Sequence, residues 1–138
     1  MDVHEPEVRS YNMSQIKGKD TKPEMIVRKF LFSKGFRYRL HVKTLPGKPD
    51  IVLPKYKTVI FVHGCFWHGH EGCRYFVIPK TRTDWWLDNI NTNKHNDERA
   101  ITLLKKVHWK IITLWECELK PSTIQETLSN LQIQILRK

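Results

Sequence analysis

The 138-residue chain has only three cysteines and no apolar run near the twenty residues that a membrane-spanning helix needs. An odd number of cysteines without an apolar leader segment argues against a secreted, disulfide-bonded protein. The sequence also has no internal repeat and no linker rich in glycine, proline or serine, which argues against repeat architectures and a second domain. We therefore expect a soluble, cytoplasmic monomer without a membrane partner, with a flexible basic arm over residues 1–19 and one domain over residues 20–138.

Acidic residues are scarce as well. The chain has 14 Asp and Glu against 24 Lys and Arg, which gives a formal net charge of +10. A surface this basic attracts polyanions, because binding releases their condensed counterions. Charge alone is equally compatible with a basic solvated surface, so it makes nucleic acid the first partner to test without establishing it.

Hydrophobic periodicity predicts an α/β domain, with a mixed central sheet flanked by helices. A capping box from Thr21 to Glu24 predicts a helix that ends at Gly35. Thr83 and Ser122 are the expected caps of two later helices, and the polar stretch at residues 91–97 could break the first of these in two. The predicted strands, of which the second and third should form a hairpin, are residues 36–41, 50–53, 58–62 and 109–115.

The three cysteines and one histidine have the spacing of a zinc site. Cys65, His70 and Cys73 form a C-x4-H-x2-C pattern, and Cys117 lies far downstream. Thiolate and imidazole ligands suit a tetrahedral Zn²⁺ ion, and four protein ligands are typical of structural sites. The alternative is that the cysteines are ordinary small buried residues. We predict a structural zinc site that orders a loop.

Asp50 begins one predicted strand and His63 ends the next, so both should lie at one edge of the sheet. A carboxylate and a main-chain carbonyl, here that of Val62, can bind Mg²⁺ through oxygen. His63 and His68 could accept a proton from an attacking water or stabilise charge on a phosphate. The structural alternative is that Asp50 is satisfied by turn amides and that His63 merely closes a strand.

Two further acidic residues have both a structural and a functional explanation. Glu24 occupies the position of a capping box where glutamate serves the helix itself. It could instead face the Asp50 edge, where it would bind a metal-associated water or orient His68. Asp97 could lie on a polar helical face or orient a catalytic histidine.

Aromatic residues stand beside both the metal ligands and a basic segment. Phe66 and Trp67 lie among the cysteines, and Trp85 and Trp86 follow the sequence TRTD. Aromatic rings can stack on bases or wedge between base pairs. We take Phe66, Trp67 and Trp86 as candidate wedges, whereas Trp85 is expected to pack beneath the loop.

The stretches LPGKPDIV, VIFVHGCFWHGH, PKTRTDWW and LWECEL together resemble the very-short-patch repair (Vsr) DNA mismatch endonucleases, in their order and approximate spacing. The resemblance runs from Arg9 to the last helix. It implies a restriction-endonuclease-like fold and a sequence-context-dependent, Mg²⁺-dependent nick 5' of the thymine in T:G mismatches, the lesion that deamination of 5-methylcytosine leaves. Double-stranded DNA with such a mismatch would be the partner, and mismatch-repair proteins are further candidates.

The same resemblance implies residue roles. Asp50 matches the metal-binding aspartate, with the Val62 carbonyl beside it, and the other catalytic candidates are His63, His68, Glu24 and Asp97. The zinc ligands would be Cys65, His70, Cys73 and Cys117. The DNA contacts would be Phe66, Trp67 and Trp86, Met13 of the arm on the minor-groove side, and Asn93 at the mismatch.

Two other functions remain open on the sequence alone. One is a restriction-type endonuclease of the same fold that cuts matched DNA. The other is a zinc-ordered DNA-binding module without catalysis, in which Asp50 and His63 only close turns.

Overall fold

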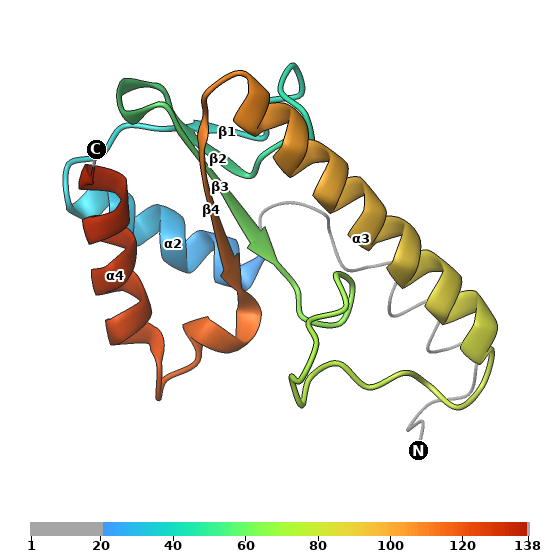
Figure 1. Cartoon of the computed structure of the whole chain (residues 1–138). Coiled ribbons are helices and arrows are strands. Elements are labelled where there is room, and N and C mark those ends of the chain that lie inside the picture. Colours follow the sequence, from blue (N-terminus) through green and yellow to red (C-terminus); the bar gives the residue numbers. More distant parts are fainter. Residues whose placement is uncertain (1–20, 138) are drawn as a thin grey trace.

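The computed structural model describes residues 21–137 (Figure 1). The predicted arm and Met13 lie outside the described residues. No helix between residues 21 and 137 is long and apolar enough to cross a membrane. The helices and strands are α2 (Lys22–Ser33), β1 (Arg39–Leu40), β2 (Ile51–Leu53), β3 (Thr58–His63), α3 (Thr83–Lys106), β4 (Lys110–Trp115) and α4 (Ile124–Leu136), with 3-10 turns η1 (Pro54–Tyr56) and η2 (Glu116–Leu119).

Within that range the strands form a four-stranded mixed sheet in the order β1-β2-β3-β4. The β1–β2 and β2–β3 pairs are antiparallel, as the predicted hairpin requires, and β3–β4 is parallel. A parallel pair needs a crossover connection, and α3 supplies it. The predicted fold class, a mixed sheet flanked by helices, is confirmed.

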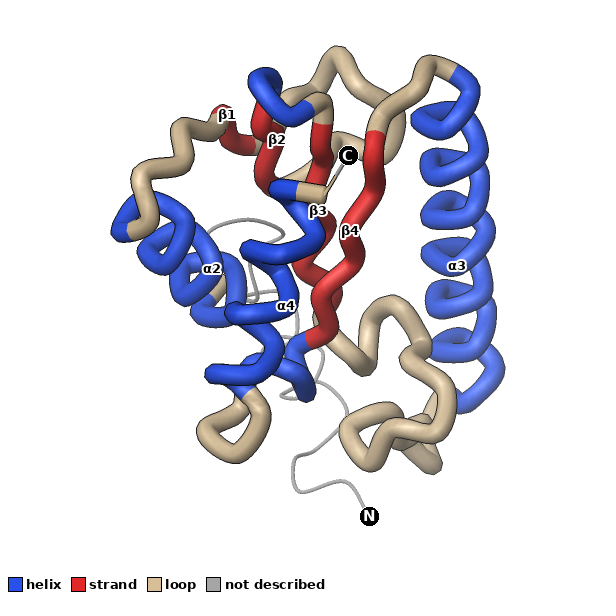
Figure 2. The backbone as a smooth tube through the Cα atoms, turned by 60° about the vertical axis from the view of Figure 1, so that its left-hand side comes forward, coloured by secondary structure: helices blue, strands red, loops and turns tan. Residues whose placement is uncertain are grey.

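Helices cover both faces of the sheet (Figure 2). On the face with α2 and α4, a core of aliphatic side chains includes Val27, Leu31, Ile51, Leu53, Ile60, Leu114, Leu131 and Ile135. On the other face, Leu104 of α3 packs with the sheet residues Val52, Val59 and Phe61. Because β3 lies between these two layers, its side chains are almost all buried, which explains its unbroken apolar run.

The helix predicted after Thr21 is present, and the Thr21 hydroxyl accepts a hydrogen bond from the Glu24 amide at 3.4 Å. The strand predicted over residues 36–41 is wrong in length, since only Arg39 and Leu40 pair with β2. Phe36 instead packs in the core, with its ring edge-on to Tyr56.

The predictions for α3 and α4 need correction at their starts. Thr83 is the first residue inside α3 rather than its cap, and its hydroxyl donates to carbonyls of the preceding turn. The cap of α4 is Thr123 rather than Ser122. Residues 91–97 do not break α3, which runs unbroken for 24 residues. Its buried side chains recur at helical spacing on one face, so packing against the sheet outweighs the weak helix propensity of the polar stretch: Trp86, Ile90, Ala100 and Leu104.

Candidate active site and metal centre

Asp50 directly precedes β2 and lies against the end of β3. Its Oδ2 accepts a hydrogen bond from the Val62 amide at 2.8 Å. In an antiparallel pair, the N–H and the C=O of a hydrogen-bonded residue both bond to the same neighbouring strand, so both groups point to that side. The Val62 carbonyl therefore lies on the side of β3 that faces Asp50, and the two predicted oxygen ligands come from adjacent positions.

The environment of Asp50 disfavours its charge. Burial raises the pKa of the carboxyl from 3.8 to about 6, and nearby Glu24 raises it further, while the Val62 hydrogen bond acts in the opposite direction. The group is still mainly ionised at neutral pH. A buried anion beside a second carboxylate is a favourable place for a divalent cation.

Glu24 reaches the Asp50 edge from α2, as the functional alternative expected. It is 1% exposed, so its carboxylate is not simply a solvated cap. Its Oε2 lies 3.2 Å from Arg28 Nη1 and 3.1 Å from His41 Nε2, and His41 Nδ1 lies 4.0 Å from Asp50 Oδ1. Sequence reasoning missed His41, because nothing in its spacing indicates that β1 carries it between two carboxylates.

His63, His68 and Asp97 form a second cluster, drawn from β3, the following loop and α3. The imidazole rings of His63 and His68 stack, with centroids 3.7 Å apart and planes 4° from parallel. His68 Nδ1 lies 2.6 Å from Asp97 Oδ2, and His63 Nε2 lies 3.9 Å from Asp97 Oδ1. Asp97 is therefore not just a polar residue on a helical face. Because Asp97 contacts Nδ1 of His68, Nε2 is the ring nitrogen of His68 that points away from Asp97.

The two histidines differ in their surroundings. Burial lowers the pKa of His63 from 6.5 to about 4, and the charge of His68 lowers it further. His63 is consequently neutral at neutral pH. Its side chain is 7% exposed, whereas that of His68 is 26% exposed. Beside them is a pocket of about 370 Å³ that Asp97 and Trp115 also line, so solvent and polar groups can reach this cluster.

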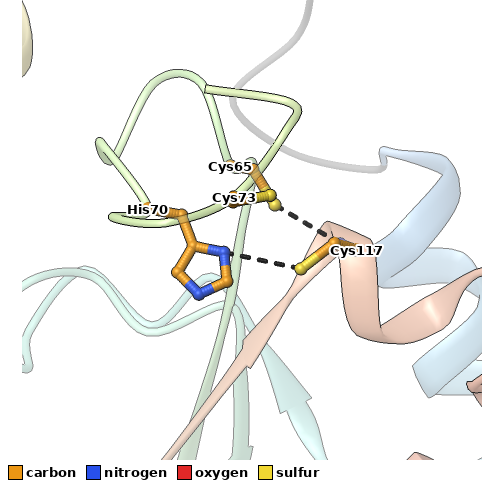
Figure 3. A group of neighbouring side chains, drawn as sticks. All are labelled: Cys65, His70, Cys73 and Cys117. Carbon is orange, nitrogen blue, oxygen red and sulfur yellow. Dashed lines mark hydrogen bonds between the residues drawn. The ribbon is translucent and has the colours of Figure 1, made fainter. Parts of the chain in front are cut away.

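The predicted zinc ligands meet at one point (Figure 3). Cys65, His70 and Cys73 come from the loop after β3, Cys117 comes from η2, and their ligand atoms all lie within 4.8 Å of one another. His70 Nδ1 is 3.4 Å from Cys117 Sγ. Ligands at the usual zinc distances of about 2.0 to 2.3 Å place tetrahedral donors roughly 3.5 to 3.8 Å apart. The cluster fits zinc after a small contraction.

Neighbouring groups hold the cysteine cluster in place. The Cys117 amide donates to Cys65 Sγ at 3.3 Å, and the His70 ring stacks on Trp115 with centroids 4.1 Å apart. Burial raises the pKa of the Cys65 thiol to about 12. A buried thiol of this kind becomes a thiolate only beside a positive charge, which a bound metal ion provides.

The aromatic candidates form one cluster at the start of α3. The ring centroids of Phe66, Trp67 and Trp86 are 5.4 to 5.7 Å apart. Trp86 is only 5% exposed, whereas Trp85 is 42% exposed beneath the Arg82 guanidinium, so the expectation that Trp85 packs under the loop is wrong. Successive helix residues point about 100° apart, and the start of α3 directs Trp86 inward. Asn93 ties the helix to the loop by donating to the Trp67 carbonyl at 2.8 Å.

Comparison with known proteins gives consistent matches. The family model described as DNA mismatch endonuclease Vsr matches residues 1–74. A type II nicking enzyme of Neisseria meningitidis, V.NmeAIP, is 51% identical over 135 residues, which cover 97% of this chain and 96% of that protein. The Xanthomonas oryzae nicking enzyme V.XorIIP is 50% identical over 83% of each chain. The DNA mismatch endonuclease Vsr of Escherichia coli K12 is 42% identical over 86% of this chain and 76% of that protein.

Proposed function

Because the chain belongs to the Vsr family of DNA mismatch endonucleases, we propose that it nicks one strand of double-stranded DNA 5' of the thymine in a T:G mismatch, within a preferred sequence context. Such a nick would initiate the repair of deaminated 5-methylcytosine. The observation that carries this proposal is the contact between Asp50 and the end of β3, beside the histidine pair that Asp97 contacts. The relatives, a mismatch endonuclease and nicking enzymes, support a nicking activity on DNA.

Asp50 and the Val62 carbonyl would hold a Mg²⁺ ion, with Glu24 close enough to bind an associated water. All three offer hard oxygen atoms, which fit this ion. When bound, the ion would lower the pKa of the attacking water and offset charge on the scissile phosphate. The Val62 amide fixes the carboxylate of Asp50 before substrate arrives, so little rearrangement is needed on binding.

His68 is our candidate for the group that accepts a proton from the attacking water. Asp97 holds Nδ1 at 2.6 Å, which sets the ring orientation and stabilises the imidazolium that forms. The neutral His63 ring covers one face of His68 and restricts its rotation. His63 would also donate a hydrogen bond to developing phosphate charge.

The zinc cluster and the aromatic residues would serve DNA distortion. A Zn²⁺ ion on Cys65, His70, Cys73 and Cys117 would brace the loop that carries Phe66 and Trp67. These rings would enter the base stack next to the mismatch, where apolar wedges unstack and kink a duplex. Trp86, which is buried behind them, would turn outward to join them when DNA binds. Asn93 would contact the mismatched pair, and Met13 would insert from the other groove.

The test is strand-resolved cleavage of labelled duplexes that carry T:G or T:A in randomised flanking sequence, with zinc-loaded protein and Mg²⁺. We expect a nick only in the thymine strand of T:G duplexes. His68→Ala should abolish most of it, Asp97→Asn should slow it, and the exposed His95→Gln on α3 is the matched control. Equal cutting of T:G and T:A duplexes would instead identify a restriction-type enzyme, and binding without cleavage on every flank would identify a zinc-ordered binding module.

A further inference from the structure

We propose that His41 is a direct ligand of the catalytic metal ion, together with Asp50 and Glu24, and that this site prefers Mn²⁺ to Mg²⁺. The inference rests on the proposed function in one respect, namely that Asp50 binds the catalytic ion. It makes Glu24 a direct ligand rather than the partner of a bound water, adds a nitrogen ligand to a set that was otherwise all oxygen, and therefore changes the expected metal.

The distances between the three side chains fit a single ion. One ligand atom from each residue lies within 4.8 Å of the other two. Octahedral ligands at about 2.1 to 2.2 Å are roughly 3 Å apart when adjacent and about 4.3 Å apart when opposite. The contacts of 3.1 Å to Glu24 and 4.0 Å to Asp50 are made by different ring nitrogens of His41, Nε2 and Nδ1, so a shared ion would use one of these nitrogens and the grouping within 4.8 Å is the observation that allows it.

The main chain fixes His41 in this place. The residue follows β1 directly, and its amide donates to the Asp50 carbonyl at 3.1 Å. Its φ of 49° lies in the left-handed region, which is unfavourable for a residue with a side chain. Such strained backbone often accompanies functional sites. Here it accompanies an imidazole that is 22% exposed and lies between two carboxylates that come from separate elements.

The ligand types distinguish between metals. Mg²⁺ binds oxygen almost exclusively and keeps several waters, whereas imidazole favours the transition metals. Two carboxylates, a main-chain carbonyl and water are oxygen ligands that Mn²⁺ also accepts. A set of mainly oxygen with one nitrogen therefore suits Mn²⁺, and it leaves the soft thiolates of the cysteine cluster to zinc.

A different role would produce the same distances. His41 could act only as a hydrogen-bond partner of Glu24, which also contacts Arg28. In that case its removal would leave the metal's nitrogen surroundings unchanged. A spectroscopic measurement of nitrogen bound to the ion separates the two roles, because it does not depend on nicking.

The experiment is Mn²⁺ titration of the zinc-loaded full chain, followed by electron paramagnetic resonance of free Mn²⁺, with pulsed measurement of nitrogen coupling to the bound ion. We expect nitrogen coupling in the wild type and its loss in His41→Gln. We also expect Mn²⁺ affinity in that variant to fall about tenfold or more, with a smaller change for competing Mg²⁺. His95→Gln is the matched control and should behave as the wild type.

Unchanged Mn²⁺ affinity and nitrogen coupling in His41→Gln would overturn the inference. Asp50→Asn distinguishes this failure from failure of the proposed site: if it abolishes Mn²⁺ binding while His41→Gln does not, the metal site stands and only the role of His41 is wrong. Should His41→Gln fail to fold, coupling that persists in His68→Gln supports the inference, and absence of coupling in the wild type refutes it.

Discussion

Replacing Asp50 with asparagine should make the protein more stable at neutral pH while removing its activity. The pKa of Asp50 is raised from 3.8 to about 6 by burial, so the folded state binds a proton more tightly than the unfolded state does. Stability from this group is fully present below about pH 4 and is lost as the pH rises through about 6. A shift of about two units corresponds to about 3 kcal/mol at pH 7.

Asparagine imitates the protonated carboxyl at every pH, and its side-chain carbonyl can still accept the hydrogen bond from Val62. We therefore expect the free energy of unfolding of Asp50→Asn to exceed that of the wild type by about 3 kcal/mol at pH 7 and to equal it near pH 4. The assay is urea denaturation of zinc-loaded protein without other divalent ions. The exposed Asp88→Asn on α3 serves as control and should change little.

Added Mg²⁺ or Mn²⁺ should narrow the difference at pH 7, because the ion binds the folded wild type and not the variant. If Asp50→Asn is equally or less stable at pH 7, then burial does not oppose the charge of Asp50, and the electrostatic account of the site is wrong.

Three further predictions concern stability and the metal cluster. Burial lowers the pKa of His63 to about 4. In the Asp50→Asn background the free energy of unfolding, measured by urea denaturation, should therefore fall by about 3 kcal/mol as the pH is lowered from 6.5 to 4. The fall should be absent when His63→Gln is added to this background. Cys117→Ser should lose bound zinc by atomic absorption but keep its far-UV circular dichroism, since most of the core lies elsewhere; full retention of zinc would refute the ligand set. Gly47→Ala should lower the free energy of unfolding by about 1 to 3 kcal/mol more than Gly35→Ala does. At Gly47 the new Cβ would lie 2.6 Å from the Ala100 methyl carbon of α3, whereas Gly35 faces open space. Equal melting temperatures of the two variants would contradict this.

Local signals predicted the elements whose ends are defined by local chemistry. The helix cap that the Thr21 side chain forms and the apolar run of β3 are present as expected. The four cysteine and histidine ligands could also be proposed together, since the chain has only three cysteines and His70 lies between two of them. Only the fold could show that η2 carries Cys117 to the loop after β3.

The errors come from tertiary contacts. The polar residues 91–97 remain helical because side chains before and after them pack on the sheet, which local propensity does not report. Trp86 lies four residues before Ile90 on the buried face of α3, so Trp86 rather than Trp85 is covered. His41 was overlooked for the same kind of reason, since α2 and the β1–β2 pair together bring it to the acidic residues.

The most direct test of the proposed function is the single-turnover nicking rate on a T:G duplex and on its matched T:A counterpart, measured for the wild type and for Asp50→Asn under the same conditions. We predict a nick in the thymine strand of the T:G duplex alone and a loss of at least about a hundredfold in the variant, despite its greater stability. Nicking by Asp50→Asn at the wild-type rate, or equal rates on both duplexes, would contradict the proposal.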